Sequence, residues 1–146
     1  MIDLLVVNHD VTIAVIGAPE EAEIADSVIE KVGHREAVKS LIGEVKLSEL
    51  PALLATAALY VGNNSGPKHI AAALGVPTVG IHSGTVDARE WGPMGVNALA
   101  VRRDVHCSPC YLATIESCPR KLACLTELRP TEVYEICARL LAIAYG

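Results

Sequence analysis

The fold is decided by the stretch YVGNNSGPKHIAAALGVP, which occupies residues 60–77. It begins with an apolar segment, passes through a loop rich in Gly and Asn, and then carries small apolar residues at helical spacing as far as Gly75. Pro67 suits the first turn of a helix, where the missing N–H has no intrahelical bond to lose. The pattern therefore predicts a buried strand over residues 59–61, a tight loop, and a helix over residues 67–74.

Segments of the same two kinds alternate on both sides of this stretch. Short apolar runs predict strands over residues 11–16, 38–42, 77–81 and 98–101, and helical spacing predicts helices over residues 20–32, from Ser48 onward, and in a final segment capped by Thr131. Such alternation is typical of α/β domains with right-handed crossovers. We therefore expect a Rossmann-like parallel sheet with helices on both faces. The loops 17–20, 62–69 and 82–85 should then follow the carboxyl ends of strands, where such sheets bind ligands.

Length, composition and charge narrow the class of protein. The 146 residues fit one domain, and they are 51% hydrophobic but only 3% aromatic, so the core must consist of Ala, Val, Ile and Leu. The net charge of −5 argues against a nucleic-acid partner, because neutralising phosphates needs a basic excess. No apolar run reaches the roughly 20 residues of a membrane span, and no secretion signal is recognisable. We expect a cytoplasmic protein.

The beginning of the chain is unusual for a complete domain. Residues 1–7 are apolar and lead directly into Asn8, His9 and Asp10, a pattern that resembles the tail of a helix before the first strand. Two interpretations stay open. Either the chain is a fragment or separately made half of a larger protein, or it begins with an ordinary amino-terminal element.

The loop from Gly62 to His69 has the chemistry of an anion site. Its glycines allow a ligand to approach the backbone closely, and the first turn of the following helix presents free N–H groups and a partial positive charge. Ser65 adds a hydroxyl, Lys68 a positive charge and His69 a group that donates or accepts near neutral pH. A diphosphate would fit this set. The alternative is a polar turn in which Ser65 caps the helix.

The same loop carries a resemblance to a known family. Residues 47–54 and 60–77, the segments Gly84-Thr85-Val86-Asp87 and Trp91-Gly92-Pro93, and the tail from Cys107 to Val133 closely resemble the carboxyl-terminal domain of glycosyltransferase family 9, the heptosyltransferases of lipopolysaccharide core synthesis. The resemblance implies one half of a GT-B enzyme, inverting and without a metal in catalysis. In that family this half binds a nucleotide sugar, often ADP-heptose, and an amino-terminal domain binds the acceptor.

The resemblance also implies roles for individual residues. Ser65 and Gly66 correspond to the phosphate-binding pair, and Asn64 stands where the family usually has an aspartate that meets the donor sugar, which puts ADP-heptose itself in doubt. Glu20 or Glu21 corresponds to an acidic residue near the ribose, although both also suit the first turn of a helix. The full set implied for donor binding is Asn64, Ser65, Gly66, Lys68, His69, Glu20, Lys46, Thr85 and Asp87.

A cysteine-rich loop over residues 106–125 is the second notable feature. Cys107, Cys110, Cys118 and Cys124 could together hold a structural zinc ion, remain free thiols, or form two disulfides. Cys137 lies on the apolar side of the final helix and is expected in the core. His82, which follows a predicted strand, is expected to be a solvated loop histidine.

These observations lead to one functional hypothesis and two alternatives. The chain is expected to be the donor-binding domain of a glycosyltransferase that acts on lipopolysaccharide or another glycan, at the inner face of the membrane where the acceptor is membrane-bound. The resemblance places the catalytic base in the amino-terminal acceptor domain, which these residues do not include, so the chain alone should bind donor without transferring sugar. The alternatives are a non-catalytic nucleotide-sugar binder and a zinc-stabilised interaction domain.

Overall fold

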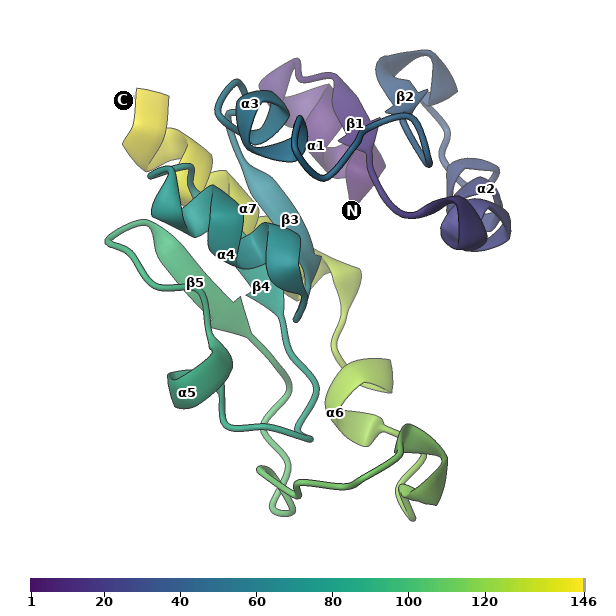
Figure 1. Cartoon of the computed structure of the whole chain (residues 1–146), viewed down its shortest axis with the longest axis vertical. Helices are drawn as coiled ribbons and strands as arrows, with labels where there is room; N and C mark the ends of the chain where they lie inside the picture. The colour runs from purple at the N-terminus through teal and green to yellow at the C-terminus, as the bar shows by residue number, and fades with distance from the viewer. Residues whose placement is uncertain (146) are drawn as a thin grey trace. The chain divides into compact units, whose positions relative to one another are not determined.

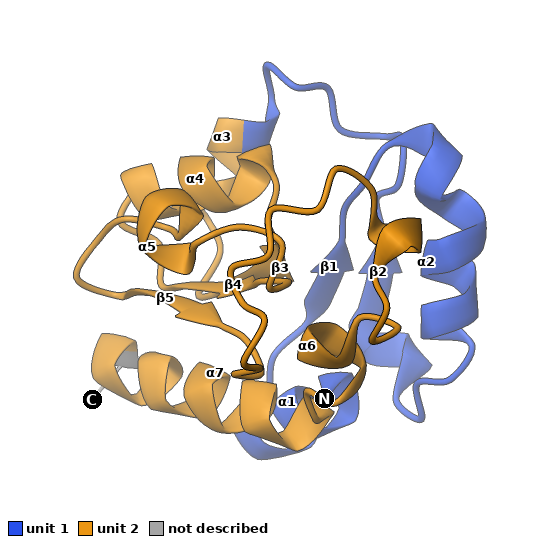
Figure 2. Ribbon diagram, turned by 90° about the horizontal axis from the view of Figure 1, so that it is seen from below, with its two compact units in different colours: residues 1–50 blue, residues 51–146 orange. Residues whose placement is uncertain are grey.

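The structure is a computed structural model that describes residues 1–145. The chain forms two compact units, Met1–Leu50 and a second that begins at Pro51 (Figure 2). Within the described residues, no helix combines the length and apolarity that crossing a bilayer requires. Each unit contains its own parallel sheet.

The first unit places two short strands side by side. Its elements are α1 (Ile2–His9), β1 (Ile13–Val15), a 3₁₀ turn η1 (Pro19–Glu21), α2 (Ala22–Ile29), a second 3₁₀ turn η2 (Arg35–Ala37) and β2 (Val38–Ser40) (Figure 1). β1 and β2 are parallel, with Ile13 opposite Val38. After β1 the Glu21 carboxylate accepts a hydrogen bond of 2.8 Å from the N–H of Ala18, which closes the turn that leads into α2.

The second unit contains three parallel strands in the order β3-β4-β5. Its elements are β3 (Tyr60–Asn63), α4 (Gly66–Ala73), β4 (Thr78–Ile81), α5 (Ala88–Trp91), β5 (Ala98–Val101), a 3₁₀ turn η3 (Ile115–Ser117), α6 (Ala123–Thr126) and α7 (Pro130–Tyr145), while α3 (Leu50–Leu54) begins at the boundary residue. The register pairs Thr78 with both Tyr60 and Ala98. α4 lies on one face of the sheet and α7 on the other (Figures 1 and 2).

Small residues let the two helices pack closely on this sheet. Ala71 of α4, Val79 of β4 and Cys137 of α7 are all fully buried. Thr78 is buried as well, and its hydroxyl donates to the carbonyl of Val76 at 2.7 Å, so burying it leaves no unsatisfied polar group. The buried hydrophobic residues of the chain are mostly Ala, Val and Leu, as a composition without Phe requires.

Most elements expected from the sequence are confirmed. All five strands form within two residues of their predicted bounds, and every strand pair is parallel. The strands are divided between two sheets, one in each unit. The predicted cap of the last helix is wrong, because α7 begins at Pro130 and Thr131 lies inside its first turn. Proline is favoured at that position, since its missing N–H has no intrahelical partner there.

Candidate functional site

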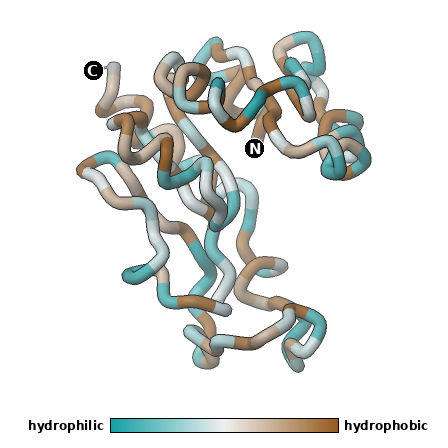
Figure 3. The backbone as a smooth tube through the Cα atoms, in the orientation of Figure 1, coloured by the Kyte–Doolittle hydropathy of each residue, from teal (hydrophilic) through white to brown (hydrophobic). Residues whose placement is uncertain are grey.

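The candidate site lies in the second unit, in the loops that follow β3 and β4. Because the three strands are parallel, their carboxyl ends share one edge of the sheet, and at that edge the chain mixes hydrophilic and hydrophobic residues (Figure 3). The β3 loop leads into α4, the β4 loop leads into α5, and the segment after β5 contains the cysteine loop. Both loops, with Asn64 to His69 in one and Thr85 to Asp87 in the other, belong to the second unit.

The turn after β3 depends on the contact between Tyr60 and Gly62. A Cβ built at Gly62 would overlap the Tyr60 hydroxyl, so glycine at this position leaves room for that hydroxyl. Burial raises the pKa of Tyr60, and a hydrogen bond with the Ser65 side chain opposes that rise. The N–H of Ser65 donates to the carbonyl of Asn63 at 2.9 Å. Contacts among residues 60–65 thus stabilise the loop without a ligand.

The first turn of α4 is open to a ligand. Ser65 is the residue before the helix, in an extended conformation, and its side chain makes no capping hydrogen bond. Gly66 is exposed, and a Cβ built on it would meet no atom within 4 Å. The first N–H groups of a helix lack intrahelical partners and carry a partial positive charge. The start of α4 therefore offers donors on an accessible surface. Ser65 occupies the N-cap position, but its side chain makes no capping hydrogen bond.

Lys68 has a different place from the one expected. Its side chain is fully buried (0% exposed), and its ammonium donates to the side-chain oxygen of Asn64 and to the main-chain carbonyl of Trp91. The Lys68 Nζ also lies 3.2 Å from the His82 Nε2. These partners use all three N–H donors of the ammonium. Lys68 therefore stabilises the loop through its hydrogen bond to Asn64 and leaves no N–H for a ligand. Burial lowers the pKa of Lys68, and none of the three partners carries a negative charge.

His82 was expected to be solvated, and that prediction is wrong. Its ring is fully buried, and burial followed by the charge of Lys68 lowers its pKa to about 4. Because Lys68 can only donate, the His82 Nε2 must be the unprotonated acceptor and Nδ1 must carry the proton. That Nδ1 has no hydrogen-bond partner among residues 1–145. His82 is therefore a neutral acceptor for the ammonium.

A glycine in β4 explains how Lys68 and His82 meet. A Cβ built at Gly80 would lie 2.7 Å from the Lys68 Cδ and 3.2 Å from the His82 Nε2. Glycine inside a strand often marks a close approach of another group. This signal was present in the sequence at Gly80, and it could have pointed to the buried pair.

His69 stays exposed beside the loop. Partial desolvation and the charge of Lys68 lower its pKa from its ordinary value, so the ring is neutral at pH 7. A neutral imidazole can either donate or accept a hydrogen bond. His69 is therefore an exposed, neutral polar group on the first turn of α4, and its role in donor binding stays a prediction.

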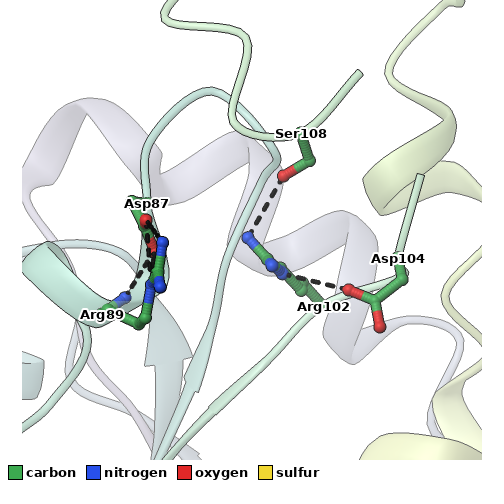
Figure 4. Close-up of polar contacts among 5 residues, drawn as sticks. All are labelled: Asp87, Arg89, Arg102, Asp104 and Ser108. Carbon is green, nitrogen blue, oxygen red and sulfur yellow. Dashed lines mark hydrogen bonds and ion pairs between the residues drawn. The ribbon is translucent and has the colours of Figure 1, made fainter. Parts of the chain in front are cut away.

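Asp87 and Thr85 are held mainly by their own neighbours. The Asp87 carboxylate accepts from the N–H of Arg89 at 2.9 Å and pairs with the Arg89 guanidinium at 2.7 Å (Figure 4). These hydrogen bonds lower the pKa of Asp87 to about 2, so it is ionised at neutral pH. The Thr85 hydroxyl lies 2.6 Å from that of Ser83. Asp87 thus caps α5, which positions the loop after β4.

The cysteine loop supports the same β4 loop through its main chain. The N–H of Cys110 donates to the carbonyl of Gly84, and the N–H of Tyr111 donates to that of Thr85, both at 2.9 Å. The Arg102 guanidinium adds a hydrogen bond of 3.1 Å to the Ser108 hydroxyl (Figure 4). The position of Thr85 therefore depends on how the cysteine loop is folded.

The four clustered cysteines line one small cavity, together with Thr85 and Arg120, of about 10 Å³. All of them carry free thiols, as does the buried Cys137. Within residues 1–145 no group of three or more His, Cys, Asp or Glu side chains is arranged to hold a metal ion. A tetrahedral zinc site would need the sulfurs to move together, and the zinc prediction stays a prediction.

Two of the expected donor residues belong to the first unit. Glu20 is exposed in η1, and Lys46 is exposed in the segment before α3, where its N–H donates to the Glu49 carboxylate at 3.1 Å. Glu21, the alternative to Glu20, already closes the turn at Ala18. Glu20 is therefore the acidic residue that remains available to a ligand in this turn.

Comparison with known proteins identifies the family. The family model described as glycosyltransferase family 9 (heptosyltransferase) matches residues 4–118. Two curated relatives, the lipooligosaccharide heptosyltransferases 2 of Campylobacter jejuni serotypes O:2 and O:6, are 30% and 28% identical over 92% and 88% of the chain. The chain spans 41% and 40% of the length of these relatives.

Two solved structures share the fold. The E. coli ADP-heptose lps heptosyltransferase II matches with a TM-score of 0.74 and 20% identity over 92% of the chain and 38% of its own length. A family 9 glycosyl transferase from Veillonella parvula matches with a TM-score of 0.72 and 22% identity over 90% of the chain and 36% of its own length. The α/β architecture with parallel sheets is thus that of GT-B enzymes. The motif around Gly66, the fold and the family match agree, and the chain belongs to glycosyltransferase family 9.

Proposed function

We propose that this chain is the donor-binding domain of a family 9 glycosyltransferase and binds a nucleoside-diphosphate sugar. The observation that carries the proposal is the open first turn of α4, which follows β3 at the carboxyl edge of the sheet. Gly66 leaves that turn accessible, and donors at a helix start favour an anion such as a diphosphate. The nearby buried ammonium of Lys68, whose partners are all uncharged, adds an uncompensated positive charge.

The contacts proposed for the rest of the nucleotide sugar follow the family resemblance. Ser65 and Gly66 meet the phosphates, and His69 lies beside them on the first turn of α4. The family resemblance assigns Glu20 to the ribose, Lys46 to the base, and Thr85 and Asp87 to the side of the β4 loop that faces the donor. The relatives named above are heptosyltransferases, and the E. coli protein is an ADP-heptose lps heptosyltransferase, so an ADP-heptose-like donor is the first to test.

The proposed reaction is inverting transfer to a lipopolysaccharide or another glycan, with the acceptor and the catalytic base supplied by an acceptor-binding domain. The Asp87 carboxylate of the β4 loop is tied to Arg89 and ionised by a pKa of about 2, so it is a poor base at neutral pH. The chain by itself is therefore proposed to bind donor without transferring it. The proposal includes a cytoplasmic site of action, at the inner face of the membrane for a membrane-bound acceptor.

Calorimetric titration of the chain with ADP-, GDP- and UDP-sugars tests this function. The expected result is saturable binding of one of the three, with the matching nucleoside diphosphate competing and the monophosphate competing more weakly. The absence of binding to all three would overturn the donor-binding function. Robust sugar transfer by the chain alone would overturn the assignment of the base to another domain.

A further inference from the structure

Lys68 is buried, but one of its partners, Asn64, is exposed on the loop after β3. The Lys68 ammonium joins this exposed side chain to the buried His82 and to the carbonyl of Trp91 at the end of α5. One buried side chain thus connects three elements of the second unit. This connection determines which atom of the Asn64 side chain faces a ligand.

The chemistry of the two groups fixes the orientation of the Asn64 amide. An ammonium has donors and no acceptor, so the Asn64 atom that faces Lys68 must be the carbonyl oxygen. The amide nitrogen is attached to the same carbon and must point away from Lys68. Orientations of asparagine amides are normally ambiguous and have to be assigned from their hydrogen-bond partners, and here the partner allows only one.

The exposed part of the loop therefore includes several hydrogen-bond donors. The Asn64 nitrogen brings two N–H groups, the first turn of α4 brings main-chain N–H groups, and residues 60–69 contain no carboxylate. A ligand atom beside Asn64 must accept a hydrogen bond. The acceptor that best fits a cluster of donors at a helix start is an anionic phosphate oxygen.

We propose that Lys68 is a positioning residue that turns the Asn64 amide so that its N–H group donates to a phosphate oxygen of the ligand. This inference rests on the proposed function and names the ligand group that Asn64 meets. It differs from the contact with sugar hydroxyls that the family resemblance implies for this position. Lys68 itself does not touch the ligand in this arrangement, because its three N–H groups are already engaged.

Substitutions at Asn64 distinguish a contact with phosphate from a contact with sugar hydroxyls. Inorganic pyrophosphate is the probe, because it carries neither base nor sugar. Asn64→Asp keeps an oxygen toward Lys68 but turns a second, negatively charged oxygen toward the ligand. We expect pyrophosphate affinity to fall by about tenfold or more in Asn64→Asp, and by less in Asn64→Ala, which removes the donor without adding a charge. Unchanged affinity in both variants would overturn the phosphate contact.

A double-mutant cycle tests whether Lys68 acts through Asn64. Lys68→Met keeps a long apolar stem in the buried position and removes the donor that orients the amide. If Lys68 positions Asn64, Lys68→Met should weaken pyrophosphate binding about fivefold more in the wild-type background than in the Asn64→Ala background. An ammonium that acted only by its charge would give equal losses in both backgrounds, and that result would overturn the positioning role.

The outcomes also separate this inference from the proposed function. Failure of the wild-type chain to bind pyrophosphate, ADP, GDP or UDP overturns the function and the inference together. Binding by the wild type with equal losses in the two backgrounds overturns the inference alone. If Lys68→Met does not fold, as judged by circular dichroism, the two substitutions at the exposed Asn64 still decide whether that side chain meets phosphate.

Discussion

The Nζ of Lys68 lies 3.2 Å from the Nε2 of His82, and both side chains are fully buried beneath the loop that carries the family motif. The pair places a cation and a neutral imidazole where neither can be hydrated. A buried charge without a negative partner raises the free energy of the empty site, and an anion bound nearby would lower it.

The first prediction concerns the pH dependence of stability. The pKa of His82 falls from 6.5 to about 4 in the folded protein, so between these values the unfolded chain binds a proton that the folded chain does not. Stability from this group is therefore complete above about pH 6.5 and is lost as the pH falls toward 4. We expect the free energy of unfolding in urea to drop by on the order of 2–3 kcal/mol more in the wild type than in His82→Gln across this window. Equal drops in the two proteins would contradict the assignment of His82 as a buried neutral group.

The second prediction compares two glycines. Gly80→Ala would place a Cβ 2.7 Å from the Lys68 Cδ, so the buried pair must shift, and we expect a loss of about 1–3 kcal/mol in the free energy of unfolding. Gly66→Ala is the matched control, because its Cβ meets nothing within 4 Å. Its stability should change by less than about 1 kcal/mol. Its pyrophosphate affinity should fall, since the added methyl group occupies the open first turn of α4. A Gly80→Ala protein as stable as the control would contradict the close packing.

The third prediction concerns the cap of α5. Asp87→Ala removes the acceptor for the N–H of Arg89 and for its guanidinium, whereas Asp87→Asn keeps a capping oxygen and loses only the charge. We expect the Tm to fall by roughly several degrees in Asp87→Ala and by less in Asp87→Asn, measured by differential scanning calorimetry. Arg89→Met, which retains the cap, should resemble Asp87→Asn. Equal losses in Asp87→Asn and Asp87→Ala would show that the charge, and not the cap, holds this loop.

The fourth prediction concerns thiol reactivity. Cys107 is exposed, whereas Cys137 is fully buried and burial raises its pKa to about 11. Because the thiolate is the reactive form, Cys107 should react first with a disulfide reagent and Cys137 only after unfolding. Mass spectrometry of partially labelled protein measures this order. Early labelling of Cys137 would contradict its place in the core of the second unit.

The zinc prediction has a separate test. If zinc draws the sulfurs of Cys107, Cys110, Cys118 and Cys124 together, protein purified without chelators should contain about one zinc per chain, and these thiols should resist labelling until the metal is removed. Because Cys110 and Tyr111 hold the β4 loop, metal removal should also weaken donor binding. A folded chain that contains no metal would end the zinc prediction.

Periodicity was sufficient for most of the fold. The stretch from Tyr60 to Pro77 predicted β3, its loop and α4, because a strand, two glycines and a helical apolar face leave few alternatives. The burial of Lys68 and His82 was not predictable in the same way. Lysine and histidine are usually exposed, and only tertiary packing at Gly80 brings them together. Local patterns define elements, whereas a buried polar pair depends on contacts between elements.

The first turn of α4 is the proposed binding site for the diphosphate. A ¹⁵N-labelled chain titrated with ADP, GDP or UDP, and with the corresponding monophosphates, would report on each backbone amide separately. We predict that a diphosphate shifts the amide signals of Gly66, Lys68 and His69 and the side-chain amide of Asn64, with saturation at lower concentration than the monophosphate. Shifts confined to other regions, or no shifts with any diphosphate, would contradict the donor site placed at this helix.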